Sequence, residues 1–180
     1  MYFTFTYFGN KFTSVTIDTN GYVVFSSSTS CCSLTRPSLS NSIPALNFDL
    51  TTTLSTNGGI YYKYLNSSSS EIVSIQSIIS PLFKATNAFS IEWNNVTALK
   101  TTSSVSFKII LATDTSSNYV VLQYSSCLSG TYTPLSTPGL NYINQNGVLV
   151  QVAIVNPCSS SNVNIPGTWV FYVTDAGEIF

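Results

Sequence analysis

The strongest constraint on the fold is a pair of long stretches in which apolar and polar residues alternate one by one. The first covers residues 89–96, and the second covers 105–114 and resumes at 119–124 after a short turn. A period of two places successive side chains on opposite faces of a strand, so these stretches are expected to be half-buried strands of a sheet. The apolar face of that sheet has to be covered, and the rest of the chain must supply the cover.

The other segments are mostly typical of short strands separated by turns. Alternation or aromatic enrichment predicts strands at residues 2–9, 12–17, 22–25, 45–50, 60–65, 148–155 and 165–173. The run at 148–155 is almost continuously apolar, which indicates a strand buried on both faces or in a sandwich core. Asn20-Gly21 predicts a hairpin turn between two of the strands, because these residues accept the positive φ that such turns need.

One segment has the periodicity of a helix. Its apolar face consists of four isoleucines: Ile72, Ile75, Ile78 and Ile79. Ser70 is placed to cap this helix, and Pro81 to end it. We therefore expect a mainly β protein: an antiparallel, β-sandwich-like single domain over residues 1–180, with one short helix at about 70–80.

Charge is scarce in this chain of 180 residues, since 7% of them are charged and the formal net charge is −1. No Lys/Arg patch is present to displace counterions from phosphates, so no nucleic-acid partner is expected. No apolar run approaches the roughly 18 residues of a spanning helix, so no membrane span is expected either. No signal peptide is visible before Tyr2, which leaves open that the chain is a piece of a longer precursor.

Four cysteines indicate an oxidising environment outside the cell, although four buried reduced thiols are the alternative. Cys31, Cys32, Cys127 and Cys158 show no CxxC metal spacing and suffice for two disulfides. A bridge between the adjacent Cys31 and Cys32 would be strained. Each of these two is therefore expected to pair with one of the two distant cysteines, in either combination.

Two N-glycosylation sequons agree with secretion. Asn66-Ser67-Ser68 heads a serine run after an expected strand, and Asn95-Val96-Thr97 lies at an expected strand end. N-linked glycans are therefore expected, with Asn66 in the better position.

The chain lacks the residues that most often carry out catalysis. The chain has no histidine, which removes the commonest general base, triad partner and metal ligand together. Glu92 and Asp114 are the best pair for glycosidase-type chemistry, but exposed strand positions explain them equally well. We expect no enzymatic activity, no catalytic residue and no cofactor.

Calcium is the metal that the side chains come closest to matching. The oxygen donors are Asp18, Asn20, Asn47, Asp49 and Asp114. None of them forms a D-x-D-x-D-G loop, and an Asx turn accounts for Asp18 and Asn20. No metal site is therefore predicted.

Aromatic side chains offer another means of binding. Trp93 and Trp169 occupy alternating strand positions that face inward, which favours core packing over stacking on sugar rings. Surface tyrosines are better suited to contact, because their rings are both apolar and polar. The expected interface residues are Tyr2, Phe3, Phe5, Tyr61, Tyr62, Tyr64, Tyr132, Tyr142 and Phe180.

The scarcity of charge also bears on assembly. Soluble monomers usually guard their edge strands with Lys or Pro and keep their net charge away from zero, and this chain has few such guards. We therefore expect a self-assembling subunit of an extracellular filament or matrix, whose partners are copies of itself or other extracellular matrix or surface proteins. The alternative is a monomeric adhesion or carbohydrate- or protein-binding module within a longer mosaic protein.

Taken in order, seven segments resemble the NIDO domain, the extracellular domain named after nidogen and present in tectorin-like and membrane-mucin-like proteins. The segments are FTFTYFGNKFTSVTIDTNGYVVF at 3–25, ALNFDL at 45–50, GGIYYKYL at 58–65, FSIEWNNV at 89–96, SFKIILATD at 106–114, YVVLQY at 119–124 and IPGTWVFYV at 165–173. Family members usually carry a glycine after the ATD segment, where this chain has Thr115. The resemblance implies a secreted or cell-surface β-sandwich-like module with no known catalytic residue.

Overall fold

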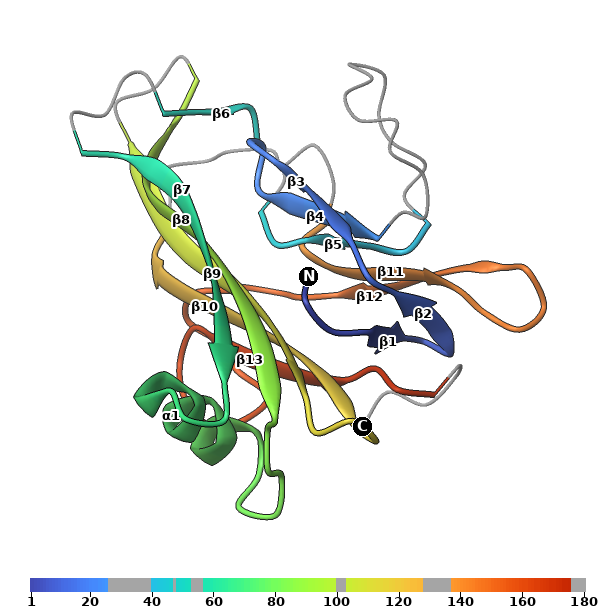
Figure 1. Ribbon diagram of the computed structural model, residues 1–180. Helices are drawn as coiled ribbons and strands as arrows, with labels where there is room; N and C mark the ends of the chain where they lie inside the picture. Colours follow the sequence, from blue (N-terminus) through green and yellow to red (C-terminus); the bar gives the residue numbers. More distant parts are fainter. Residues whose placement is uncertain (26–39, 47, 53–56, 100–102, 128–136, 176–180) are drawn as a thin grey trace.

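Two antiparallel sheets lie face to face in the computed structural model, with one helix on the outside of the larger sheet (Figure 1). The structure describes residues 1–25, 40–46, 48–52, 57–99, 103–127 and 137–175. A mainly β fold of packed antiparallel sheets with a short helix confirms the predicted fold class.

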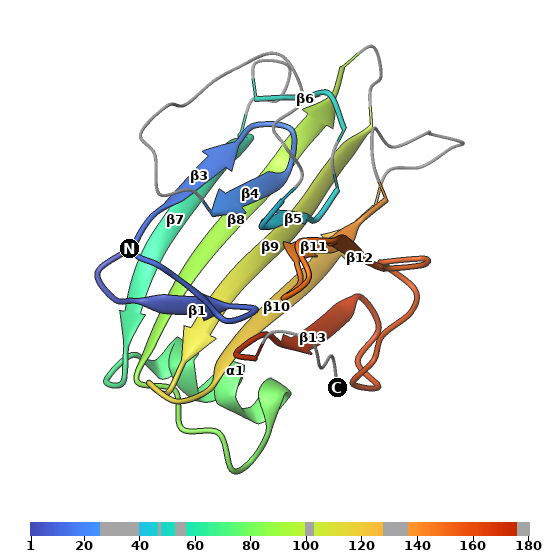
Figure 2. The same ribbon diagram turned by 90° about the vertical axis from the view of Figure 1, so that its right-hand side faces the viewer.

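The larger sheet has six strands in the order β13-β10-β9-β8, and β7 and β6 both pair with the remaining edge of β8. Their bounds are β6 Leu50–Thr51, β7 Gly59–Asn66, β8 Asn87–Ala98, β9 Ser104–Thr113, β10 Asn118–Ser126 and β13 Thr168–Tyr172. The three long strands β8, β9 and β10 lie side by side in the centre, as Figure 2 shows. The alternating stretches of the sequence therefore form the middle of this sheet.

The smaller sheet has five strands in the order β12-β11-β5-β4-β3. Their bounds are β3 Val15–Asp18, β4 Tyr22–Phe25, β5 Ser42–Pro44, β11 Gly139–Ile143 and β12 Leu149–Ala153. A separate hairpin, β1 Phe5–Tyr7 with β2 Asn10–Phe12, precedes this sheet. The prediction of a strand at 45–50 is wrong. This segment connects β5 of the smaller sheet to β6 of the larger sheet, and only Leu50 belongs to a strand.

The hairpin between β3 and β4 forms at the predicted turn. The Asp18 Oδ1 accepts a hydrogen bond of 2.8 Å from the Asn20 N–H, as expected of an Asx turn. Gly21 takes the positive φ of 86°. Its carbonyl then accepts the N–H groups of Ala45 and Leu46, which ties the turn to the segment that connects the two sheets.

The main core lies between the sheets and consists of the inward-facing positions of the long strands. Trp93 is fully buried, stacks on Phe107 at 4.9 Å between ring centroids, and donates its Nε1–H to the Asp18 carbonyl at 3.2 Å. The inward position predicted for Trp93 is confirmed. Trp169 packs on the same core but is half-buried, because it lies on the outermost strand β13.

One end of the opposite face of the six-stranded sheet is covered by the helix α1, Ser70–Ile79 (Figure 1). Ile72 and Ile75 pack there against Ile110, Ala112 and their neighbours. Residues 109–112 are therefore buried on both faces of the sheet, which explains why this stretch is uninterrupted by polar residues. The expected span of the helix is confirmed, but its N-cap is Ser69 and not Ser70, and no side-chain capping bond is present.

The strand expected at 148–155, buried on both faces or in a sandwich core, forms β12 over Leu149–Ala153 and buries one face only. Val150 and Val152 are half-buried and pack against the main core, whereas Leu149 and Val155 are 48% and 68% exposed. Burial on both faces is therefore wrong, because an apolar run shows what a strand could bury and not whether a neighbouring element covers each face.

Candidate interaction surface

Glu92 and Asp114 do not form a catalytic pair. Glu92 lies directly opposite Lys108 on β9, and its Oε2 is 3.5 Å from the Lys108 Nζ. Asp114 follows Lys108 by six residues along an extended strand, a separation of about 20 Å. Two carboxyl groups must lie within about 10 Å to act together on a glycosidic bond.

Asp114 instead shapes the turn between β9 and β10. Partial burial would raise the pKa of this carboxyl, but hydrogen bonds to it outweigh that effect and hold the pKa below its ordinary value. The donors are the Ser117 N–H at 2.6 Å, the Ser116 hydroxyl at 2.8 Å and the Ser116 N–H at 3.0 Å. This arrangement is that of a structural turn.

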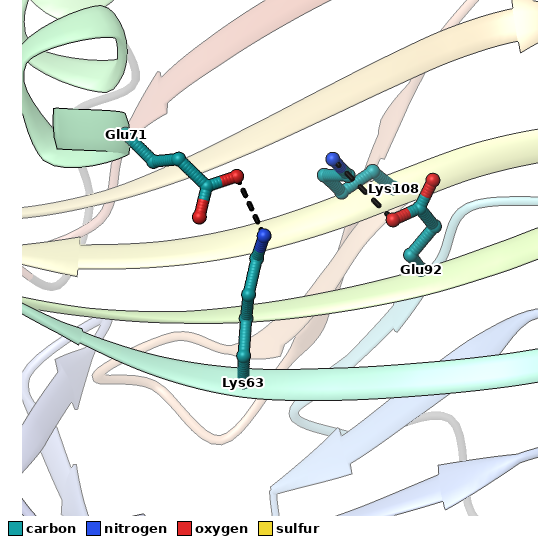
Figure 3. A network of polar contacts seen from close by, with 4 residues as sticks. All are labelled: Lys63, Glu71, Glu92 and Lys108. Carbon is teal, nitrogen blue, oxygen red and sulfur yellow. Dashed lines mark hydrogen bonds and ion pairs between the residues drawn. The ribbon is translucent and has the colours of Figure 1, made fainter. Parts of the chain in front are cut away.

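Two ion pairs lie on the outer face of the six-stranded sheet, beside α1 (Figure 3). One joins Glu92 to Lys108, and the other joins the Lys63 Nζ on β7 to the Glu71 Oε1 on α1 at 2.5 Å. The Lys63 side chain is therefore directed over the sheet face towards the helix.

β7 is an open edge of the six-stranded sheet. It pairs with β8 along Gly59–Asn66, and within the described part of the chain no strand pairs with its other side. The opposite edge of the sheet, β13, is covered: the Asn162 side chain accepts the Val170 N–H at 2.9 Å and donates to the Val170 carbonyl at 2.6 Å. Of these two edges, β7 is therefore the one open to a further strand.

Exposed aromatic residues gather along this edge. Tyr61, Tyr62 and Tyr64 of β7 are 55%, 69% and 36% exposed. The rings of Tyr2 and Phe3 contact Tyr64 at 5.6 and 6.0 Å between centroids, and Tyr2 is 89% exposed. These five residues form what we call the β7 edge surface, and all five are among the interface residues expected from the sequence.

Two other expected interface residues are buried, and the expectation for them is wrong. Phe5 is fully buried and stacks on Phe25, while Tyr142 is 4% exposed and stacks on Phe8. Both belong to the core between the sheets, because the β1–β2 hairpin and β11 pack against it. The remaining candidates, Tyr132 and Phe180, lie outside the described residues.

A groove that no sequence pattern predicts lies between the β1–β2 hairpin and the β11–β12 turn. Its volume is about 450 Å³, and it is lined by Phe8, Gly9, Asn10, Asn41, Ile143, Asn144 and Gln145. The Asn41 Oδ1 is buried and has no hydrogen-bond partner among the residues that the structure describes, which is costly for a polar atom. No sequence signal identifies this groove, because its carboxamides come from three distant segments.

The cysteine pairing differs from the expectation. Cys127 and Cys158 form a disulfide with each other, with their Cα atoms 6.2 Å apart. The expectation that each of them pairs with Cys31 or Cys32 is therefore wrong. It followed from the strain of a bridge between adjacent cysteines, whereas the observed pairing follows from the proximity of the end of β10 to the segment before β13. Cys31 and Cys32 lie outside the described residues.

The sequons lie in different surroundings. Asn66 is the exposed last residue of β7, whereas Asn95 is half-buried within β8. Asn95 is therefore not at a strand end as expected, but at a bulge where the pairing of β8 with β9 shifts, and its φ is 49°.

Metal ligands do not cluster in the described part of the chain, where no three Cys, Asp or Glu side chains lie close enough to hold an ion. The side-chain oxygens of Asp18 and Asn20 accept backbone N–H groups: the Asp18 Oδ1 accepts the Asn20 N–H at 2.8 Å, and the Asn20 Oδ1 accepts the Leu50 N–H at 3.1 Å. Asn47 lies outside the described residues. Among the described residues no helix is long and apolar enough to span a membrane.

Comparison with known proteins gives one match. The model of the nidogen-like domain family, NIDO, matches residues 13–175, which cover both sheets, the helix and the Cys127–Cys158 disulfide. No curated protein and no solved structure matches the chain.

Proposed function

Because the chain belongs to the nidogen-like domain family, we propose that it is an extracellular structural module that assembles with a second copy of itself through the β7 edge surface. NIDO domains are non-catalytic extracellular modules found in nidogen and similar mosaic proteins. The Cys127–Cys158 disulfide is consistent with secretion. The family leaves the specific role open, and the open edge of β7 is the observation that carries the proposal.

An open edge strand is a template for another strand, because its outward N–H and C=O groups have no partner in the sheet. Natural proteins commonly place a lysine on such an edge to prevent this pairing. The lysine of β7, Lys63, is paired with Glu71 at 2.5 Å and directed towards α1. The edge therefore lacks an effective guard, and exposed aromatic rings flank it instead.

The sequence of β7 is compatible with pairing to itself around a two-fold axis. Residues directly opposite in an antiparallel pair share one face of the sheet. Centring the pair on Tyr62 places Tyr62 against Tyr62 of the second copy and Tyr61 against its Lys63. Of the two neighbouring registers that preserve the faces, the one centred on Lys63 opposes two lysines, and the one centred on Tyr61 places Lys63 against Gly59 and not against a tyrosine ring, which disfavours both. Centring on Tyr62 therefore defines the proposed register.

Low charge supports association of two identical copies. The formal net charge is −1, so the long-range repulsion between copies is small. Tyrosine rings contribute large contact areas with few rotatable bonds, which suits them to interfaces.

Sedimentation velocity over a range of protein concentrations tests the proposal. The expected result is a reversible dimer for the unchanged chain and a monomer for Tyr62→Lys, which would oppose two charges at the centre of the pair. Leu149→Lys is the matched control, because Leu149 is 48% exposed on β12, an edge of the other sheet. A monomer at every concentration, or equal loss of the dimer in both variants, would refute the proposal.

A second candidate function is the binding of a carbohydrate in the groove beside the β1–β2 hairpin. The favouring observation is a groove of about 450 Å³ lined by the carboxamides of Asn10, Asn41, Asn144 and Gln145, which suit sugar hydroxyls. Titration with simple sugars, followed by two-dimensional NMR, should shift the signals of Asn10 and Asn41. Unchanged signals at millimolar sugar would exclude this function for the sugars used.

A further inference from the structure

The sequon Asn66-Ser67-Ser68 is presented at the surface as a compact turn. All three residues are exposed: Asn66 is the last residue of β7, and Ser67 and Ser68 follow it before α1. The Ser69 N–H donates to the Asn66 carbonyl at 2.9 Å, which closes the turn. Solvent therefore surrounds the asparagine side chain and the hydroxyl that define the sequon.

Hydrogen bonds orient the carboxamide of Asn66. Its Oδ1 accepts the Ser68 hydroxyl at 2.5 Å and the Ser68 N–H at 3.1 Å. Within the described part of the chain its Nδ2 donates no hydrogen bond, so a substituent on Nδ2 would break none of them. The nitrogen that forms an N-glycosidic bond is thus the atom that the turn leaves pointing to solvent.

The sequon at Asn95 has the opposite surroundings. Asn95 is half-buried at the β8 bulge, and its N–H donates to the Ser106 Oγ at 2.9 Å. Val96 is fully buried and Thr97 is 6% exposed, and Thr97 pairs with both Thr51 and Ser104. A glycan at this position would have to leave from the middle of the paired sheet.

We propose that Asn66 carries an N-linked glycan and that Asn95 does not. The donor is an oligosaccharide linked to a lipid diphosphate, which secretory compartments supply to entering chains. The Asn66 Nδ2 forms a bond to C1 of the first sugar and loses a proton. The bond from C1 to the diphosphate oxygen breaks, and the lipid diphosphate leaves with its electron pair.

Folding explains why one sequon is retained as a site and the other is not. A glycan on Asn66 extends from an exposed turn and leaves the β7–β8 pairing and the packing of α1 intact. A glycan on Asn95 would compete with the packing around Val96 and the pairing of Thr97, so chains modified there would fold poorly. Glycosylation of Asn66 requires only the exposed sequon and does not require self-pairing of β7.

The experiment is secretion of the full chain from a eukaryotic host behind a cleavable signal, followed by enzymatic deglycosylation in heavy-oxygen water. Peptide mass spectrometry then locates each asparagine that was converted to aspartate. The expected result is labelled conversion at Asn66 alone and a gel shift equivalent to one glycan. No shift in the secreted chain, or labelled conversion at Asn95, would overturn the proposal.

Four variants separate loss of the site from loss of folding. Asn66→Gln and Ser68→Ala should each abolish the shift, Ser68→Thr should retain it because the hydroxyl is kept, and Asn95→Gln should leave it unchanged. The thermal unfolding midpoint of each secreted variant, measured after deglycosylation, controls for folding. A shift that persists in Asn66→Gln would contradict the inference.

Discussion

The turn at Gly21 connects the hairpin of the smaller sheet to the central aromatic pair of the core, and its replacement by alanine has a calculable cost. Gly21 has φ 86°, a region in which a residue with a Cβ atom loses roughly 1–2 kcal/mol. A Cβ atom there would also lie 2.8 Å from the Phe107 Cζ and 3.3 Å from the Leu46 Cβ. Phe107 stacks on Trp93 and has little room to move, so overpacking adds about 1–3 kcal/mol.

Gly147 provides a matched control for backbone strain. Its φ is 74°, and a Cβ added there would have no atom within 4 Å. Gly147→Ala should therefore cost only the strain of roughly 1–2 kcal/mol, while Gly21→Ala should cost about 2–5 kcal/mol in the free energy of unfolding. The smaller conformational entropy of the unfolded alanine variants offsets both losses equally.

Urea denaturation followed by tryptophan fluorescence measures both free energies of unfolding, with equal m-values as the check that the transition is comparable. Trp93, which contacts Phe107, and Trp169 both contribute to the fluorescence, and both pack on the main core. Equal losses in the two variants would refute the reasoning, because they would show that Phe107 and Leu46 yield to the added methyl group without cost.

Three further predictions concern the disulfide, the acidic turn and the open edge. Replacing both Cys127 and Cys158 with alanine should lower the free energy of unfolding by roughly 3–4 kcal/mol, because the bridge closes a separation of 31 residues; urea denaturation measures this. Since the pKa of Asp114 is lowered by folding, its contribution to stability is complete above about pH 4 and is lost as the pH falls through the folded pKa. Asp114→Asn should therefore reduce the acid-dependent loss of the melting temperature. Glu71→Gln should free Lys63 and weaken self-association in sedimentation velocity, whereas Glu92→Gln, which frees Lys108 away from the edge, should not.

Local periodicity was sufficient to predict the middle of the larger sheet and the helix. The alternation at 89–96 and 105–114 persists because each strand buries one face against the other sheet, and the isoleucines of α1 recur at helical spacing because they face the opposite side. In both cases the period of the apolar residues within a single stretch of sequence identifies the face that the element buries.

Long-range contacts were not predictable in the same way. Phe5 and Tyr142 were expected at the surface, yet both are stacked in the core. Phe5 stacks on Phe25 and Tyr142 on Phe8, and no local sequence pattern connects these partners. The tyrosines of β7 are exposed, as expected, because they lie on both faces of the strand, and a strand with aromatics on both faces cannot bury all of them. The pairing of Cys127 with Cys158 likewise depends on a spatial neighbour.

The two edges of the larger sheet show why scarce charge alone did not identify the site. β13 is closed without any charged residue, because the Asn162 carboxamide satisfies both backbone groups of Val170. β7 carries a lysine, the residue that most often protects an edge, but Glu71 on α1 draws it over the sheet face. Whether an edge is open thus depends on where hydrogen-bonding groups point and not on how many charges the chain has. Within the described part of the chain, the β7 edge surface combines an edge that no further strand pairs with and exposed aromatic rings, and for that reason we propose it as the interface.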